Sequence, residues 1–327
     1  CLKKDFKFLD YREAMSFILR ISYEAEEVDH HPEIFNCYNR VSLSLNTHFK
    51  FAALSASLVL ASACAVQYPI PSAQLQIKNI VELPEELSET SGLFCETDGM
   101  YSLNDSGNAP IIYRINYQGE IIERTRLPLT NKDWEAITAD ASSFYIADVG
   151  NNKGKREQVE IHKVNRSNVN DITSITLKYE GNDASNNIPY AHDFDSEAMV
   201  KHGDDLLLFS KSWKTGITHI YKVNEDEAEQ TISTFASIDG LPGVVTGVDF
   251  DQHQNRFVIT GYKSDPFGNF ATFMAQVSSD FALLDVWPLE QYKQVEGICV
   301  DNSGTYWFSE EATEGRKASL SSARVMP

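Results

Sequence analysis

The stretch Glu135-Ala136-Ile137-Thr138-Ala139, followed by Phe144-Tyr145-Ile146-Ala147-Asp148, predicts two short consecutive β-strands. Ala, Ile, Phe and Tyr dominate both runs, and aromatic and β-branched residues fit the pleated, partly buried surface of a sheet. Each run is only five residues long, which favours a strand over a helix. This pair of strands is the unit from which the rest of the chain can be interpreted.

The same unit recurs along residues 70–327. Four further stretches open in the same way: Ser91-Gly92-Leu93, Glu197-Ala198-Met199, Thr246-Gly247-Val248 and Glu296-Gly297-Ile298. Each is followed by a second apolar run, at residues 99–103, 206–210, 256–260 and 305–309. The starts lie 44 to 62 residues apart, the spacing of one four-stranded propeller blade plus its loops.

Third and fourth strands are predicted in most units, for example at residues 111–115 with 121–127, and 217–223 with 231–235. The last unit has no fourth strand after residues 319–325, but residues 76–83 could supply it and close the ring. We therefore predict a mainly β fold for residues 65–327, a five-bladed β-propeller with no helix-rich insertion.

Three of the repeat starts carry a carboxylate at the same position. Glu135, Glu197 and Glu296 begin equivalent inner strands, so closure of the ring would direct all three towards one axial mouth. Carboxylate oxygens are ligands for hard cations, which predicts a divalent-cation site and names Ca²⁺ as its ion. The alternative is that these glutamates only bond loop amides and hydroxyls.

Loop motifs of these repeats suggest a relationship. The stretches Asn104-Asp105-Ser106-Gly107-Asn108, Asp133-Trp134-Glu135 and Asp148-Val149-Gly150-Asn151-Asn152 resemble exported lipoprotein β-propellers of the lactonase-like type. The resemblance implies a unit that binds a ligand or hydrolyses a small ester or lactone.

The charge is strongly acidic, with 28 Lys and Arg against 47 Asp and Glu, a net charge of -19. Residues 1–48 hold six of the basic and eight of the acidic side chains, so the remainder is near -17. Such a surface repels nucleic acid and suits cations or cationic partners. The five cysteines are an odd number and imply no disulfide framework.

Residues 5–48 have a different pattern, of the α+β kind. Asp10 and Glu13 form a capping-box-like pair that predicts a helix from about Tyr11. Apolar residues then recur at helical spacing, and a second set alternates with Ser and Asn as in a half-buried strand. These residues are Ala14, Ile18, Ile21, Ala25 and Val28, and then Val41, Leu43 and Leu45.

The end of this helix and the strand carry the run Glu26-x3-His30-His31-Pro32-x5-Tyr38-x9-His48. Over residues 5–48 this run resembles the pterin-4a-carbinolamine dehydratases, which remove water from 4a-hydroxytetrahydropterin to give quinonoid dihydropterin. The resemblance implies a cytoplasmic enzyme with a pterin substrate, no cofactor and an oligomeric state.

It also implies roles for single residues. His30 and His48 would transfer protons, His31 would bind the substrate, and Glu26 would orient a histidine. Asn46 and Thr47 would contribute backbone groups to the pterin edge.

Two alternatives to this site stay open. His30 and His31 could simply bond the last carbonyls of the helix, or the histidines could ligate zinc.

The segment also departs from the family pattern. No aspartate occurs between His48 and Asp98, where a final Asp-bearing helix would be expected, and the family's first helix and strand have no room before Phe6. These departures predict a truncated dehydratase core over residues 1–48.

Between the two patterns lies an apolar segment, residues 49–64. Lys50 precedes a run of about 13 apolar residues, too short to span a bilayer, which ends Leu60-Ala61-Ser62-Ala63-Cys64. This order resembles a bacterial lipoprotein export signal with Cys64 as the lipidated residue. A buried hydrophobic segment is the alternative. An internal signal would attach the following unit to a membrane in the cell envelope, and its position predicts a fusion, an internal start or a sequence join.

Overall fold

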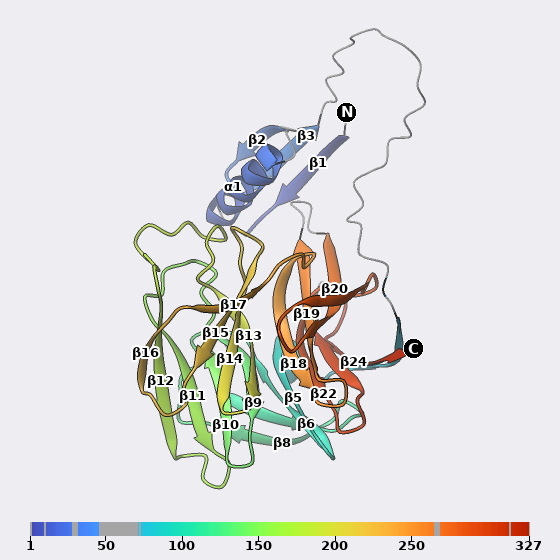
Figure 1. Ribbon diagram of the computed structural model, residues 1–327. Coiled ribbons are helices and arrows are strands. Elements are labelled where there is room, and N and C mark those ends of the chain that lie inside the picture. Colours follow the sequence, from blue (N-terminus) through green and yellow to red (C-terminus); the bar gives the residue numbers. More distant parts are fainter. Residues whose placement is uncertain are drawn as a thin grey trace. The chain divides into compact units, whose positions relative to one another are not determined.

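The computed structural model describes residues 2–9, 11–27, 32–45, 71, 73–264, 269–313 and 315–326. The chain folds into two compact units. The first unit is drawn mainly from Cys1–Gln67, and the second consists of Tyr68–Lys263 and Phe270–Pro327. Figure 1 shows the helices and strands of both units. In the described residues, no helix is both long and apolar enough to cross a membrane.

In its described residues, the first unit contains one helix and a three-stranded antiparallel sheet. The elements are β1 (Leu2–Lys7), α1 (Tyr11–Glu27), β2 (Glu33–Cys37) and β3 (Arg40–Leu45), and the sheet order is β1-β3-β2. The helix begins at the predicted Tyr11. Just before it, the Glu13 carboxylate accepts a hydrogen bond of 2.7 Å from the backbone N–H of Leu9, which satisfies a donor at the helix start. Asp10, the predicted cap, lies outside the described residues.

The core of this unit joins one face of α1 to β3. Its fully or nearly fully buried members are Ala14, Phe17, Ile21, Val41 and Leu43. The predicted apolar stripe is confirmed at Ala14, Ile21 and Ala25, with Ile18 half-buried and Val28 outside the described residues. The alternating strand is confirmed over residues 41–44, because Val41 and Leu43 are buried while Ser42 and Ser44 are only half-buried.

One expectation for the first unit is wrong. The residues before Phe6 do provide a strand, since β1 pairs antiparallel with β3 from Leu2↔Leu45 to Lys7↔Arg40. The pairing uses the backbone groups of β3 that β2 leaves free, so a short opening segment is sufficient. The sequence analysis does not predict β2, Glu33-Ile34-Phe35-Asn36-Cys37. In the structure most of its side chains are exposed, with no alternation of buried and exposed positions.

The described strands of the second unit form five sheets. The first sheet consists of β5 (Thr90–Glu96), β6 (Gly99–Asn104), β7 (Ile111–Ile115) and β8 (Ile121–Arg126), and the second of β9 (Trp134–Ala139), β10 (Ser143–Asp148), β11 (Val159–Asn165), β12 (Ile172–Tyr179) and β16 (Glu229–Ile232). The third consists of β13 (Ser196–His202), β14 (Asp205–Ser210), β15 (Thr218–Val223) and β17 (Thr234–Ile238), and the fourth of β18 (Val244–Asp251), β19 (Arg256–Ser264), β20 (Phe270–Ser278) and β21 (Leu283–Pro288). The fifth consists of β22 (Val295–Val300), β23 (Tyr306–Glu310), β24 (Ser319–Met326) and β4 (Gln74–Glu82). A short 3-10 helix, Glu85–Leu87, follows β4.

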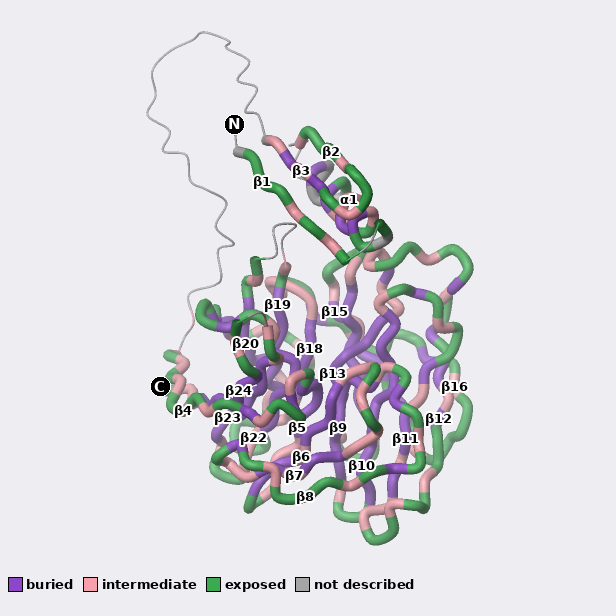
Figure 2. Tube along the Cα trace, turned by 180° about the vertical axis from the view of Figure 1, so that it is seen from behind, coloured by how far each residue is buried: buried purple, intermediate pink, exposed green. Residues whose placement is uncertain are grey.

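The first strand of each sheet lies beside the first strand of the next. These inner strands, β5, β9, β13, β18 and β22, contact one another in that order, and β22 returns to β5. Five hydrophobic clusters fill the spaces between adjacent sheets; one of them joins Leu103 and Ile112 to Ile137 and Ile146. The inner strands accordingly appear mostly as buried in Figure 2. The sheets therefore form a closed ring.

The ring closes where the first and last strands of the unit meet. As predicted, the segment before the first repeat completes the last sheet: β4 pairs antiparallel with β24 from Glu82↔Ser319 to Gln74↔Met326. The final sheet is thus made from both ends of the unit, and it leaves no unpaired edge beside β24.

The prediction of one fourth strand over residues 231–235 is wrong. That run is divided: β16 pairs parallel with β12 of the preceding sheet, and only β17 pairs with β15 of its own sheet. Ile232 explains the division, because its buried side chain packs in the cluster between those two sheets together with Tyr179 and Val223.

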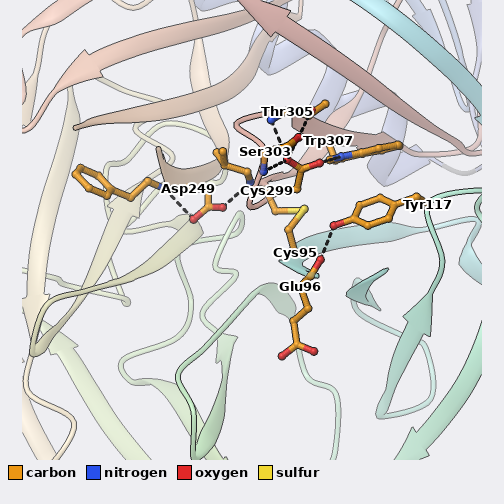
Figure 3. The surroundings of a disulfide bond; sticks show 11 residues. Cys95, Glu96, Tyr117, Asp249, Cys299, Ser303, Thr305 and Trp307 are labelled. Carbon is orange, nitrogen blue, oxygen red and sulfur yellow. Dashed lines mark hydrogen bonds between the residues drawn. A yellow bond between two sulfur atoms is a disulfide. The ribbon is translucent and has the colours of Figure 1, made fainter. Parts of the chain in front are cut away.

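The odd number of cysteines implied no disulfide framework, but the structure contains one disulfide in its described residues. Cys95 of β5 and Cys299 of β22 form a disulfide, with a Cα–Cα distance of 5.4 Å and a sequence separation of 204 (Figure 3). The two strands become neighbours only when the ring closes, so the cysteine spacing does not indicate the pair. Cys37 is a free, exposed cysteine of the first unit.

Candidate functional site

Each of the five inner strands carries a β-bulge near its start. The pairing with the second strand skips a residue at the same place in every sheet. The skipped positions are Ser91 with Gly92, Glu135, Glu197, Thr246 and Glu296. A bulge redirects the side chain of its extra residue and is common beside functional sites. The predicted equivalence of the three glutamates therefore has a structural basis.

Because these positions lie near the starts of the inner strands, they surround one end of the ring, which we call the mouth. Glu135, Glu197, Thr246 and Glu296 line one small pocket there. The inner strands approach one another closely: a Cβ atom on Gly297 would lie 2.5 Å from the Ser91 carbonyl oxygen, so only glycine fits at that position. The ring is thus tight enough to bring the three carboxylates into a single pocket.

The two hydroxyl residues of the mouth connect neighbouring inner strands. Ser91 Oγ donates a hydrogen bond of 2.7 Å to the backbone carbonyl of Glu135, and Thr246 Oγ1 donates to the carbonyl of Val295. Ser91 and Thr246 therefore stabilise the ring, whereas the three glutamates at the equivalent positions can carry charge.

A second set of mouth residues lies at the ends of the second strands: four directly follow their strand, and the fifth lies within β19. In each sheet, one residue of the second strand pairs with the inner-strand residue that precedes the bulge, and the mouth residue is the next one along the chain. The five positions are therefore equivalent. They are Asp105, Val149, Lys211, Tyr262 and Glu311. None of these five residues was predicted to belong to a site, although Asp105 and Val149 lie in the loop motifs. Alignment of the repeats on their second strands would have revealed them.

Lys211 is a cation built into the mouth. Its ammonium donates hydrogen bonds to the Glu197 carboxylate and, at 3.2 Å, to the Tyr262 hydroxyl. Lys211 and Glu197 are each only about 5% exposed. Burial by itself would lower the pKa of Lys211, but the charges of Glu197, Tyr262 and Glu296 outweigh it and raise the pKa well above the usual value. Lys211 therefore neutralises the Glu197 side of the mouth.

The other side of the mouth holds three carboxylates without such a partner. Asp105, Asp133 and Glu135 each offer an oxygen, and these oxygens all lie within 4.8 Å of one another. Glu135 is 5% exposed. Burial, followed by the charges of Glu197 and Asp105, raises its pKa well above the usual value. Burial likewise raises the pKa of Asp105 to about 6.

Gly150 covers this carboxylate group. A Cβ atom there would lie 2.2 Å from Glu135 Oε1 and 2.5 Å from Asp133 Oδ2. The backbone of the stretch Asp148-Val149-Gly150-Asn151-Asn152 therefore passes directly against the two carboxylates, which only a residue without a side chain allows.

Acidic groups also gather at the last sheet. Burial raises the pKa of Glu296 to about 8 and that of Glu311 to about 8. The structure thus brings the three predicted glutamates together, adds Asp105, Asp133 and Glu311, and supplies the counter-charge of Lys211.

Most of the predicted dehydratase residues lie outside the described residues. These are His30, His31, Asn46, Thr47 and His48, and Cys64 of the predicted signal lies outside them as well. Glu26 lies in the last turn of α1. Tyr38 occupies the turn between β2 and β3 with a φ of 54°. The structure therefore describes the helix and sheet that flank this site.

Comparison with known proteins identifies the first segment. Residues 1–57 match the family model described as pterin 4 alpha carbinolamine dehydratase, a longer stretch than the predicted 5–48. A putative pterin-4-alpha-carbinolamine dehydratase of Paraburkholderia xenovorans is 47% identical over 47 residues, 14% of this chain and 49% of that protein. One of Burkholderia ambifaria is 40% identical over 60 residues, 18% of this chain and 59% of that protein.

The solved structures found are distant. An α-L-arabinofuranosidase from Podospora anserina in complex with cellotriose has a TM-score of 0.49 at 8% identity, covering 78% of this chain and 98% of that one. The virginiamycin B lyase of Staphylococcus aureus has a TM-score of 0.38 at 18% identity, covering 74% and 68%. Likenesses this low say nothing about activity.

The chain spans about half the length of the curated relatives it matches. Residues 1–57 are accordingly similar to part of the pterin 4 alpha carbinolamine dehydratases, and in this chain they precede a larger, mainly β unit.

Proposed function

We propose that residues 1–57 dehydrate a 4a-hydroxytetrahydropterin to the quinonoid dihydropterin. The family match carries this proposal, since it includes the run from Glu26 through His30, His31 and Pro32 to His48. The folded helix and sheet around that run support it, because they supply a scaffold for both ends of the motif.

In the proposed reaction one histidine protonates the 4a-hydroxyl, which leaves as water, and another accepts a proton from the ring nitrogen. His30 and His48 take these two roles, since an imidazole can both donate and accept protons near neutral pH. His31 binds the substrate, Glu26 orients a histidine, and backbone groups of Asn46 and Thr47 face the pterin edge. The reaction needs no cofactor.

The test is the dehydration rate of the full chain and of two variants, His30→Ala and His48→Ala. Each variant should lose at least about a hundredfold in rate, the usual contribution of a general acid or base. His253→Ala is the matched control, because this exposed histidine belongs to the second unit and its ring contacts the Asn302 carbonyl, a bond outside the proposed dehydratase site. Wild-type turnover in both active-site variants would overturn the assignment.

For the second unit we propose a five-bladed β-propeller that is exported and attached to a membrane through Cys64. The five sheets, the ring of inner strands and the closure of β24 by β4 support the propeller. The disulfide between Cys95 and Cys299 supports export, because such bonds form and persist mainly in oxidising compartments.

Metabolic labelling with a radioactive fatty acid tests the attachment. The wild-type chain should incorporate label, and Cys64→Ser should not. Cys37→Ser is the control, since it also removes a free cysteine but leaves the signal-like segment intact. Equal labelling of wild type and Cys64→Ser would refute lipidation at this residue.

A further inference from the structure

We propose that Asp105, Asp133 and Glu135 together bind one divalent cation of the calcium type. Their oxygens lie within 4.8 Å of one another. Oxygen ligands of one calcium ion stand about 2.3–2.6 Å from it, so any two of them are at most about 5 Å apart. The three side chains therefore already have the separation that a shared ion requires.

Glu135 points to a ligand independently of the cluster. Its side chain is more than nine-tenths buried, and in the described part of the chain its carboxyl is affected only by burial and by charges acting through space, with no hydrogen-bond donor among the causes of its raised pKa. A buried charge without a partner is costly, and buried polar groups are normally paired. The bulge in β9 and the bare backbone of Gly150 hold the carboxylate in this position.

Neighbouring cations do not satisfy this group. Arg156 Nη2 is 2.7 Å from Asp148 Oδ1, and the same guanidinium donates to the carbonyls of Asp148 and Gly150. Lys211 donates to Glu197. Both charges reach the cluster only through space.

The structure also changes the predicted set of ligands. The sequence predicts a site made of Glu135, Glu197 and Glu296, but the Lys211 ammonium already occupies the Glu197 side, and its charge also acts on Glu296. The mouth thus has two sides. On one side the Lys211 ammonium neutralises Glu197, and on the other side the carboxyl groups of Asp105, Asp133 and Glu135 can bind a cation. Carboxylates with no Cys or His among them favour a hard cation over zinc.

Isothermal titration of the chelator-treated full chain with calcium chloride tests the proposal. The wild-type chain should bind one calcium ion in this region and melt at a higher temperature in its presence. Glu135→Gln and, separately, Asp105→Asn should weaken binding at least tenfold, since each removes one ligand charge. Asp239→Asn, an exposed acid of the same unit, should leave binding unchanged.

Lys211→Met provides an opposite change. Removal of the internal ammonium should tighten calcium binding at least threefold, because its charge repels the ion across the mouth. Melting of every variant without calcium verifies that it is folded. If either Glu135→Gln or Asp105→Asn is not folded, the other still tests the proposal. No heat and no melting shift for the wild type in millimolar calcium would overturn the proposal, and so would unchanged affinity in Glu135→Gln and Asp105→Asn.

Discussion

Cys95 is bonded to Cys299 across two inner strands that are 204 residues apart in sequence. The bond joins the first sheet of the second unit to the last, at the inner strand β22, whereas β4 completes that last sheet at its opposite edge. The ring is therefore closed twice, once by backbone pairing and once by a covalent bond. The surrounding groups are ordered as well: Trp307 Nε1 donates to Asp301 at 3.0 Å, and the Tyr117 hydroxyl donates to the Glu96 carbonyl (Figure 3).

Loss of the disulfide should destabilise the second unit. A cross-link that closes a loop this long restricts the unfolded chain and contributes about 3–5 kcal/mol to the free energy of unfolding. We expect the double substitution Cys95→Ala and Cys299→Ala to lower the melting temperature of this unit by several degrees in calorimetry. Cys37→Ser, which removes the free cysteine of the other unit, is the control. An unchanged melting temperature would show that the bond adds nothing to stability.

The closing strand should tolerate substitution on one face only. Ile77 of β4 packs into the cluster that includes Val258 and Phe308, whereas Ile80 of the same strand is 53% exposed. Ile77→Asp should lower the free energy of unfolding by about 2–3 kcal/mol, because it places a charge against apolar side chains. Ile80→Asp should cost less than about 1 kcal/mol. Urea unfolding of both variants measures the difference. Equal losses in the free energy of unfolding would contradict the packing of β4 against the last sheet by one face.

Asp249 should make the second unit less stable as the pH rises. Burial raises the pKa of its carboxyl to about 7, although the carboxylate accepts hydrogen bonds from the backbone N–H groups of Val300 and Phe250. The folded state thus binds this proton more tightly than the unfolded state does. Stability is greatest while the group is protonated, and it falls as the pH rises from about 4 through about 7.

Asp249→Asn should therefore reduce the loss of stability between pH 5.5 and 8.5. The measurement is the urea midpoint at both pH values, with Asp204→Asn, an exposed acid, as the control. If the wild type and Asp249→Asn lose the same stability over this range, the carboxyl of Asp249 does not titrate in it.

The parts of the fold that local patterns determine could be predicted from the sequence. The helix α1 follows from the apolar spacing of Ala14, Ile21 and Ala25, and the closing strand β4 follows from the missing strand after β24. Glu135, Glu197 and Glu296 could be placed in one mouth because they recur at the same point of three of the five repeats.

The remaining features depend on closure of the ring, which no local pattern contains. Cys95 and Cys299 meet only when the first sheet reaches the last. Lys211 and Asp105 enter the mouth from the second strands, so their roles depend on the register of pairing within each sheet. The crossing of β16 to the preceding sheet likewise follows from burial of Ile232 between sheets.

The dehydration rate of a 4a-hydroxytetrahydropterin, measured with the full chain and with residues 58–327 alone, tests the central claim most directly. If dehydratase chemistry resides in residues 1–57, the full chain should accelerate the loss of water above the uncatalysed rate. The shorter chain should leave that rate unchanged while it keeps the circular dichroism spectrum of a β-rich protein. Equal rates for the two chains would contradict the claim.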